Sequence, residues 1–207
     1  MRLFVLGATG KTGTALVEQG LARGHDVTAF GRSAFGGEGK SLRVLAGNPM
    51  DAKELTAALP GHEVVLSALG KRGLGATSVV SDGARATVEA MRTTGLRRLL
   101  IVSSTLFDSN VGWFTRLMGR TLLRHVVADQ QAMEELVTRS DLDWTVMRAA
   151  RLTNGAFTGK YIVSDEPGGA GFSGRAMSCQ DLACMMLDEA ERGNYIKQVV
   201  RVCGASS

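Results

Sequence analysis

The chain has 207 residues, of which 44% are hydrophobic and 21% are charged, and its formal net charge is +4. This length fits one α/β domain with a buried core and is short for two domains. The mild positive charge suits an anionic cofactor or substrate and is not the concentrated basic patch of a nucleic-acid-binding protein.

The first predicted strand runs directly into a glycine-rich turn. Glycines recur there at steps of three, as Gly7, Gly10 and Gly13, and a helical pattern covers 10–23. Gly7 permits a sharp turn, Gly10 leaves room for a pyrophosphate, and Gly13 lets the helix approach the strand closely. The free N–H groups at a helix start attract anions. We therefore predict a dinucleotide site that contains Gly7, Thr9, Gly10, Lys11, Thr12 and Gly13.

The second predicted strand ends at Phe30, where dinucleotide-binding proteins place an acidic residue about twenty residues after the turn. The chain has no Asp or Glu at that point and continues with Gly31, Arg32 and Ser33. A carboxylate would accept from the ribose 2′-OH of NAD, whereas Arg32 and Ser33 offer donors that suit a 2′-phosphate. The sequence therefore favours NADP(H) over NAD(H).

Short apolar runs and helical patterns alternate along the rest of the chain, which predicts right-handed βαβ units on a parallel sheet. We expect a single-domain, Rossmann-like, doubly wound sheet over residues 1–207, with helices on both faces. Asp51 and Ser78 are the expected helix N-caps. Substrate loops are expected around 105–113 and 150–178. The predicted strands end near residues 6, 30, 45, 66, 102, 147 and 202, and the predicted helices cover 10–23, 51–58, 78–94, 114–139 and 179–192.

Small and polar residues follow the later strands at their carboxyl ends, which is where such sheets bind ligands. Leu69 and Gly70 follow the fourth strand, and the glycine permits close approach of the cofactor. The fifth strand delivers Ser103 and Ser104, whose hydroxyls suit the nicotinamide carboxamide or a substrate carbonyl. After the sixth strand, Arg151 suits an anionic group of the substrate.

These motifs together resemble the atypical short-chain dehydrogenase/reductase superfamily. The resemblance rests on the glycine turn, Arg32, Leu69–Gly70, Ser103–Ser104 and the segment 142–148. It is strongest for the NAD(P)-binding, NmrA-like proteins related to biliverdin-IX-beta reductase, also called flavin reductase. It implies NADPH-dependent hydride transfer to a flavin, a bilin, a quinone or a similar conjugated acceptor. It also implies that Arg32 meets the 2′-phosphate and that Ser104 is an active-site serine.

The chain departs from its presumed relatives in two places. Biliverdin-IX-beta reductases carry a histidine at the end of the sixth strand, where this chain has Ala150 and Arg151. Conventional short-chain dehydrogenases use a tyrosine with a lysine four residues later as general acid and base. Neither Tyr161 nor Tyr195 has a lysine at that spacing. Reduction of a flavin or bilin needs no strong positioned acid, because the product anion is conjugated and solvent supplies the proton.

His125 is the side chain that we weigh as a substitute proton donor. It shares a predicted helical face with Asp129, although a lone histidine on a helix more often has a structural role. The catalytic candidates are therefore Ser104, Arg151 and His125.

The chain shows no sign of export or membrane insertion. Residues 1–7 form a predicted strand without a signal-peptide core, and no apolar run approaches the roughly 20 residues of a membrane helix. Cys179, Cys184 and Cys203 form no C-x-x-C pair and have no histidine at metal spacing. We expect a cytoplasmic protein with free thiols and no metal site.

Three functions stay open on this basis. The first is an NADPH-dependent reductase of a conjugated acceptor, with a flavin as one substrate. The second is a non-catalytic, NmrA-like sensor of NADP, which the missing tyrosine–lysine pair permits. The third is an isomerase or an electron-transfer assembly factor on the same fold. The expected partner is a small-molecule acceptor, without nucleic acid or membrane, and the expected assembly is a monomer or a homodimer.

Overall fold

A computed structural model of the protein describes residues 1–33, 36–37, 39–70, 78–105, 123–165 and 175–205. The strands are β1 (Arg2–Leu6), β2 (Asp26–Gly31), β3 (Leu42–Ala46), β4 (Val64–Ser67), β5 (Arg98–Ser104), β6 (Asp143–Ala149), β7 (Arg151–Thr153), β8 (Tyr161–Ser164), β9 (Ala176–Ser178) and β10 (Gln198–Gly204). The helices are α1 (Lys11–Ala22), α2 (Ala52–Ala58), α3 (Val79–Thr94), α5 (Arg124–Thr138) and α6 (Cys179–Arg192).

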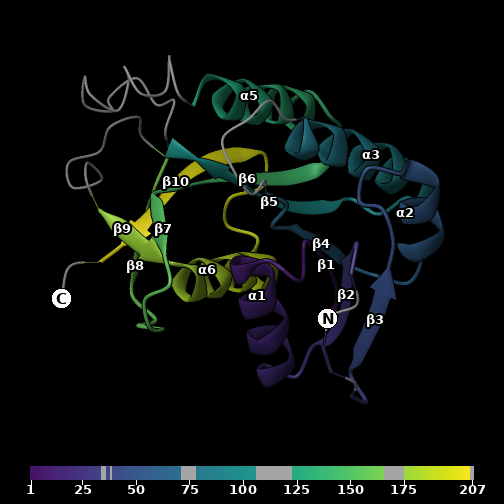
Figure 1. The fold of residues 1–207 in the computed structure, drawn as a ribbon, viewed down its shortest axis with the longest axis horizontal. Helices are drawn as coiled ribbons and strands as arrows, with labels where there is room; N and C mark the ends of the chain where they lie inside the picture. Colours follow the sequence, from purple (N-terminus) through teal and green to yellow (C-terminus); the bar gives the residue numbers. More distant parts are fainter. Residues whose placement is uncertain (34–35, 38, 71–77, 106–122, 166–174, 206–207) are drawn as a thin grey trace.

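The strands form a mainly parallel, doubly wound sheet. Its order is β3-β2-β1-β4-β5-β6-β10-β8, and the chain changes direction of winding between β1 and β4. Helices α1 and α6 lie on one face of the sheet, while α2, α3 and α5 cover the other (Figure 1). This arrangement confirms the predicted Rossmann-like fold. Sheets of this kind bind ligands beside the carboxyl ends of the strands, at the point where the winding reverses.

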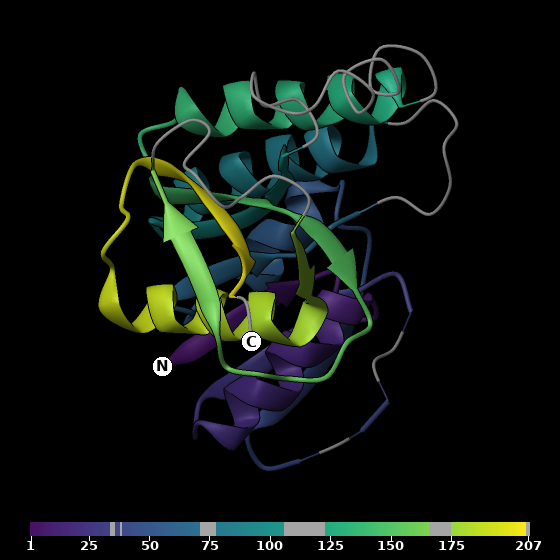
Figure 2. The same cartoon turned by 90° about the vertical axis from the view of Figure 1, so that its left-hand side faces the viewer.

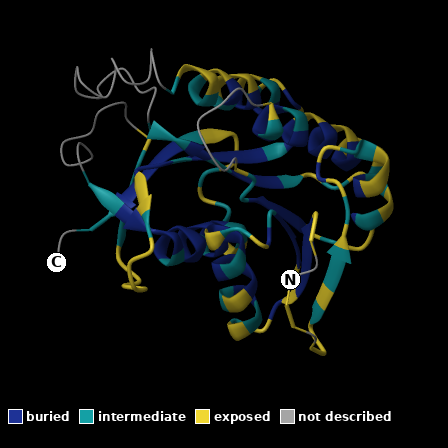
Figure 3. Cartoon of the chain, viewed as in Figure 1, coloured by how far each residue is buried: buried dark blue, intermediate teal, exposed yellow. Residues whose placement is uncertain are grey.

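Two hydrophobic cores enclose the sheet, one on each face. In β1, Leu3 and Val5 pack on the α1–α6 side, whereas Phe4 and Leu6 pack on the α2–α3–α5 side. All four side chains are fully buried. A strand that is buried on both faces must be apolar throughout, which explains the unbroken apolar runs in the sequence. Figure 3 shows this buried layer in dark blue between exposed helix surfaces.

The segment 150–178, expected to be loop, contains three short strands. β7 pairs with β9 in a separate parallel ladder, and β8 adds an antiparallel edge strand to the main sheet beside β10. They have only three or four residues each and lie among glycine, threonine and serine, and the longest apolar run among them, residues 161–163 in β8, has only three residues. The expected helix 114–139 is observed as α5, from Arg124. Residues 106–122, and with them nearly all of the expected loop 105–113, lie outside the described residues.

The two predicted N-caps differ in outcome. Asp51 caps α2 as predicted, because its carboxylate accepts from two backbone N–H groups of the first turn. Ser78 occupies the N-cap position of α3, but its side chain makes no capping bond. Asp129 of α5 takes that role instead, accepting from the N–H groups of Val80 at 3.1 Å and Ser81 at 2.9 Å. A tertiary contact therefore replaces the local cap.

Gly13 holds α1 against the turn that follows β1. A Cβ atom on Gly13 would lie 2.1 Å from the carbonyl oxygen of Gly7, which is a backbone atom. We expect Gly13→Ala to lower the free energy of unfolding by about 3 kcal/mol, since the turn must shift to admit the methyl group. Urea unfolding monitored by circular dichroism measures this loss.

Gly10→Ala is the matched control for Gly13→Ala. A Cβ atom on Gly10 meets a single neighbour, the Gly7 oxygen at 3.2 Å. Because glycine is only a moderately better N-cap than alanine, the expected loss is below about 1 kcal/mol. Equal losses in the two variants would show that Gly13 is not in close contact with the turn.

Candidate cofactor and substrate site

The turn after β1 lies between the ends of the two neighbouring strands. Gly7 has a φ of 76°, and its N–H donates to the carbonyl oxygen of Phe30 in β2 at 3.1 Å. On the other side, a Cβ atom on Gly7 would lie 2.8 Å from the carbonyl oxygen of Ala68, just after β4. Only glycine combines this positive φ with such a close approach. The turn therefore lies at the reversal point of the sheet.

The start of α1 presents backbone N–H groups that form no hydrogen bond within the described part of the chain. The first helical bond joins the N–H of Thr14 to the carbonyl oxygen of Gly10 at 2.8 Å. This leaves the N–H groups of residues 11–13 outside the helical pattern. Gly10 supplies no capping side chain, and the first turn contains no acidic residue. Helices α2, α3 and α6 have carboxylate or hydroxyl caps, whereas α1, like α5, has neither a side-chain cap nor an acidic residue in its first turn. The start of α1 is therefore open to an external anion.

The predicted 2′-phosphate residues lie at the same edge of the sheet. Arg32 and Ser33 are exposed immediately beyond the last residue of β2. The Oγ1 atom of Thr9 lies 3.9 Å from the position of a Cβ atom on Gly31, so the segments that follow β1 and β2 touch. Lys11 is also exposed here. The fold thus brings together the two parts of the chain from which the sequence predicted NADP binding.

The segment that follows β4 contributes an anchored leucine and an open glycine. Leu69 packs on α3, where a Cβ atom on Gly83 would lie 2.5 Å from the Leu69 Cδ1 atom. Gly70 is exposed, and among the described residues, its chain neighbours aside, no heavy atom lies within 4 Å of the position of its Cβ. Leu69 and Gly70 therefore adjoin the glycine turn, as expected for residues that line a cofactor site.

The two serines at the end of β5 have different surroundings. Ser103 is 3% exposed, and its hydroxyl donates to Oε1 of Glu134 in α5 at 2.5 Å. The same carboxylate binds Arg148 of β6. Consecutive strand residues point to opposite faces, so the half-buried Ser104 lies on the other side of the sheet. The Ser103 hydroxyl is thus engaged by the protein, while the active-site role of Ser104 stays a prediction.

The other two catalytic candidates lie at the surface. Arg151 is exposed in β7. His125 is exposed in the first turn of α5, where its Nε2 atom accepts from Nε of Arg124 at 3.2 Å. Asp129, the expected partner of His125, instead uses both carboxylate oxygens to cap α3. The structure therefore does not support a His125–Asp129 proton relay.

A carboxylate at the start of α6 holds the loop that joins β7 to β8. Asp181 is 3% exposed and accepts from the N–H groups of Thr158 and Gly159, at 2.8 and 2.9 Å. It also accepts from the hydroxyls of Thr158 and Ser178. Burial by itself raises the pKa of this carboxyl, but the hydrogen bonds keep the pKa below its usual value. Figure 2 shows the loop, in green, running alongside α6.

Sequence patterns did not predict that Glu134 and Asp181 would hold other segments in place. Both are acidic residues within amphipathic helices, where a carboxylate is ordinarily solvated. Their partners are separated from them by 14 to 31 residues. Only the hydroxyl-rich segment before α6, with Ser178 three residues ahead of Asp181, carries a local capping signal.

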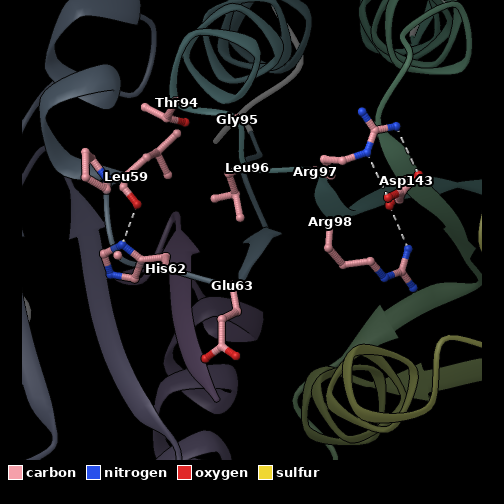
Figure 4. A pocket seen from close by; sticks show the side chains of 11 residues that line it. Leu59, His62, Glu63, Thr94, Gly95, Leu96, Arg97, Arg98 and Asp143 are labelled. Atoms are coloured by element: carbon pink, nitrogen blue, oxygen red, sulfur yellow. Dashed lines mark hydrogen bonds and ion pairs between the residues drawn. The ribbon is translucent and has the colours of Figure 1, made fainter.

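A hollow of about 330 Å³ opens at the opposite end of the sheet, where β4, β5 and β6 begin (Figure 4). Its charged groups are paired, as in the Arg97–Asp143 ion pair at 3.2 Å. His62 contacts Leu59 and Thr28, and burial lowers the pKa of its imidazole. Ligands of doubly wound sheets bind at the carboxyl ends of the strands, so we do not place the candidate site in this hollow.

Two further observations cover the described part of the chain. No described helix is both long and apolar enough to cross a membrane. The described residues contain no group of three histidine, cysteine, aspartate or glutamate side chains placed to hold a metal ion. The three cysteines are free and buried, as predicted for core thiols.

The fold and the open start of α1 define a Rossmann-type nucleotide-binding protein. Residues 7–192 match the model of the NAD(P)H-binding family, and the chain therefore belongs to that family. This membership is consistent with the resemblance to atypical short-chain dehydrogenase/reductases.

The relatives in sequence include two uncharacterized proteins. One, from Bacillus subtilis and named YwnB, is 26% identical over 206 residues, which cover 94% of each chain. The other, a chloroplastic protein of Arabidopsis thaliana, is 29% identical over 184 residues. That match covers 80% of this chain but 64% of the plant protein, so this chain spans less than two thirds of the plant relative's length.

Similar solved structures share the fold at low sequence identity. A short-chain dehydrogenase/reductase from Veillonella parvula, solved in complex with NADP, has a TM-score of 0.83 at 18% identity. It covers 99% of this chain and 95% of its own. A candidate NADH-flavin reductase from Streptococcus pneumoniae has a TM-score of 0.80 at 23% identity and covers 99% and 100% of the two chains.

The hydrogen bonds that Asp181 accepts predict that the protein loses stability in acid. Because the folded pKa of Asp181 lies below the unfolded value, the stabilisation is full above about pH 4 and is lost as the pH falls through the folded pKa. Asp181→Asn is expected to cost about 2–3 kcal/mol at pH 7, since the backbone and hydroxyl donors lose a charged acceptor.

Urea unfolding of both proteins across the acid range measures this effect. The difference in free energy of unfolding between wild type and Asp181→Asn is expected to narrow as the pH falls below about 4. A difference that stays constant down to the acid limit would show that the Asp181 carboxylate is not the source of the stabilisation.

Proposed function

We propose that this protein is an NADPH-dependent reductase that passes hydride to a conjugated acceptor such as a flavin, a bilin or a quinone. The observation that carries the proposal is the uncapped start of α1 beside the exposed Arg32. Membership of the NAD(P)H-binding family supports the cofactor, and the likeness to a candidate NADH-flavin reductase favours the acceptor class.

The residues at this edge fit a dinucleotide. The position of a Cβ atom on Gly10 has a single neighbour within 4 Å, so the backbone there is open on the side that a pyrophosphate would occupy. The N–H groups of residues 11–13 would hold the pyrophosphate, and Lys11 adds a positive charge. Arg32 and Ser33 would hold the 2′-phosphate, because a guanidinium donates charge-assisted hydrogen bonds to phosphate.

The protein would contribute mainly by orienting the nicotinamide and the acceptor, and less by acid catalysis. Bound NADPH supplies a hydride. Gly70 and Ser104 follow neighbouring strands at the carboxyl edge, where they would border the nicotinamide and the acceptor. Holding two reactants in stacking geometry lowers the entropic part of the barrier. Solvent then protonates the conjugated product anion.

Tyr161 is unsuited to the role of a catalytic tyrosine. Its hydroxyl donates to Asp188 in α6, and burial together with that carboxylate raises the pKa of the phenol. A catalytic tyrosine of a short-chain dehydrogenase needs the opposite shift, which a neighbouring lysine provides. This contact argues against alcohol oxidation by a Tyr161-based mechanism.

A non-catalytic, NADP-sensing regulator is the second candidate. The sequence has no tyrosine–lysine pair, and Asp129 caps α3 while His125 accepts from Arg124. Both facts favour a sensor, because neither provides a positioned acid. Both candidates share the cofactor site, so turnover distinguishes them. In either role we propose a cytoplasmic monomer or homodimer that acts on or with small molecules.

A turnover assay tests the proposed function. Purified protein is mixed with NADPH and, in turn, FMN, riboflavin, a quinone and a bilin, and loss of NADPH absorbance is followed. Gly10→Val is the negative control, because a branched side chain fills the space for the pyrophosphate. Tight NADPH binding without turnover of any acceptor would favour the sensor.

Arg32 is expected to set the cofactor preference. Arg32→Ala removes a charge-assisted contact worth about 1.5–3 kcal/mol, which weakens NADPH binding roughly ten- to a hundredfold. NADH binding is expected to change little, and isothermal calorimetry measures both. Arg43→Ala, which removes the same charge from β3, is the matched control. Equal losses for both cofactors would mean that Arg32 does not read the 2′-phosphate.

Ser104 is expected to place ligands without donating the proton. Ser104→Ala should slow flavin reduction about tenfold or less, whereas loss of a positioned general acid costs about 10²–10⁴-fold. The rate should also lack a steep change between about pH 6 and 8, including in His125→Gln. Steady-state kinetics across this range check both points. A thousandfold loss in Ser104→Ala would show that Ser104, and not solvent, supplies the proton. An ionisation that disappears in His125→Gln would show the same for His125.

A further inference from the structure

Two buried glutamates tie the central strands β5 and β6 to helices, one at each end of the strand pair. Glu134 of α5 acts at the carboxyl end, and Glu189 of α6 acts at the amino end. We propose that Glu134 is a positioning residue for the reaction proposed above, because it fixes the strand ends that carry Ser104 to the nicotinamide. This proposal rests on the proposed cofactor site, whereas Glu189 serves the fold alone.

The carboxyl-end cluster consists of Ser103, Glu134 and Arg148. Oε1 of Glu134 accepts from the Ser103 hydroxyl at 2.5 Å and from Nε of Arg148 at 3.0 Å, and Oε2 accepts from Nη2 of Arg148 at 2.7 Å. The Glu134 side chain is 8% exposed. Ser103 and Arg148 are paired across the β5–β6 ladder, and the next pair, Ser104 with Ala149, is its last.

The amino-end cluster also contains an arginine, a hydroxyl and a glutamate, on the opposite face. Oε1 of Glu189 accepts from Nη2 of Arg98 at 2.5 Å and lies 3.4 Å from the Thr145 hydroxyl, which donates to the carbonyl oxygen of Tyr195 at 2.8 Å. Glu189 also accepts from the N–H groups of Asn194 and Tyr195. Nη1 of Arg98 also donates to the Thr145 hydroxyl at 2.8 Å. The Glu189 side chain is 1% exposed. One arginine, one hydroxyl and one glutamate therefore join β5, β6 and a helix in each cluster.

The difference between the clusters is their distance from the site. Ser104 directly follows Ser103, and its pairing with Ala149 is the last of the β5–β6 ladder. Charge-assisted hydrogen bonds are shorter and more directional than neutral ones, and burial strengthens them. The Glu134 cluster thus fixes the backbone from which the Ser104 hydroxyl projects.

The proposal separates placement of the nicotinamide from affinity for the cofactor. The glycine turn and Arg32 would supply most of the affinity, and neither touches Glu134. Weakening the carboxyl-end cluster should therefore leave NADPH bound with a mobile nicotinamide ring. A bound reduced nicotinamide fluoresces more strongly when it is held rigidly, so its fluorescence reports this placement directly.

The experiment compares matched variants of the full-length protein. Glu134→Gln and Ser103→Ala are expected to change the Kd for NADPH by less than about threefold and to lose most of the fluorescence enhancement of bound NADPH. They are expected to lower kcat with the acceptor by up to about tenfold, the loss expected of Ser104→Ala. Glu189→Gln and Thr145→Val are the controls at the amino end. They are expected to lower Tm by a similar amount while keeping the fluorescence and kcat of the wild type.

Equal loss of fluorescence enhancement in both sets of variants would overturn the proposal, because the effect would then be general loosening of the fold. Wild-type fluorescence in Ser103→Ala and Glu134→Gln would also overturn it. Ser103→Ala leaves the Glu134–Arg148 ion pair in place, so it decides the matter if Glu134→Gln does not fold. If the wild type binds NADPH but reduces no acceptor, the reductase function fails, and the fluorescence comparison still decides the role of Glu134.

Discussion

The close contact between Gly13 and the Gly7 carbonyl is the constraint on which the rest of the site depends. It brings the start of α1 onto the end of β1, and so directs the helix dipole toward the reversal point of the sheet. A methyl group at residue 13 would push α1 away from the turn, and its N–H groups would then lie too far from a ligand beside β2 and β4. The glycine spacing therefore sets the packing of α1 on the turn, and the same three glycines are part of the proposed dinucleotide site.

Carboxylates organise the remaining helices in a different way. Asp129, Asp181, Glu134 and Glu189 are all buried, and each joins its helix to another segment. Buried charges are costly unless they are paired, so each one specifies a single arrangement of its partners. The start of α1 has no such acid, which keeps this helix terminus available for a cofactor.

Local patterns predicted the parallel sheet and the glycine turn, while tertiary contacts determined the rest. The glycine turn, the missing acid after β2 and the alternation of apolar runs are all readable within a few residues. Strands β7, β8 and β9 were missed because pairing, and not composition, makes them strands. Helical spacing placed His125 and Asp129 on one face, but the hydrogen bonds of the Asp129 carboxylate to α3 depend on tertiary structure and are not visible in that spacing.

The capping of α3 by Asp129 makes the first turn of α3 depend on α5, a helix that comes later in the chain. Its hydrogen bonds span 48 and 49 residues, so the first turn of α3 gains its cap only after α5 has docked. Closing a loop of that length costs entropy before the bond repays it. The N–H groups of Val80 and Ser81 thus become protected from hydrogen exchange together with the α3–α5 interface, as one cooperative unit.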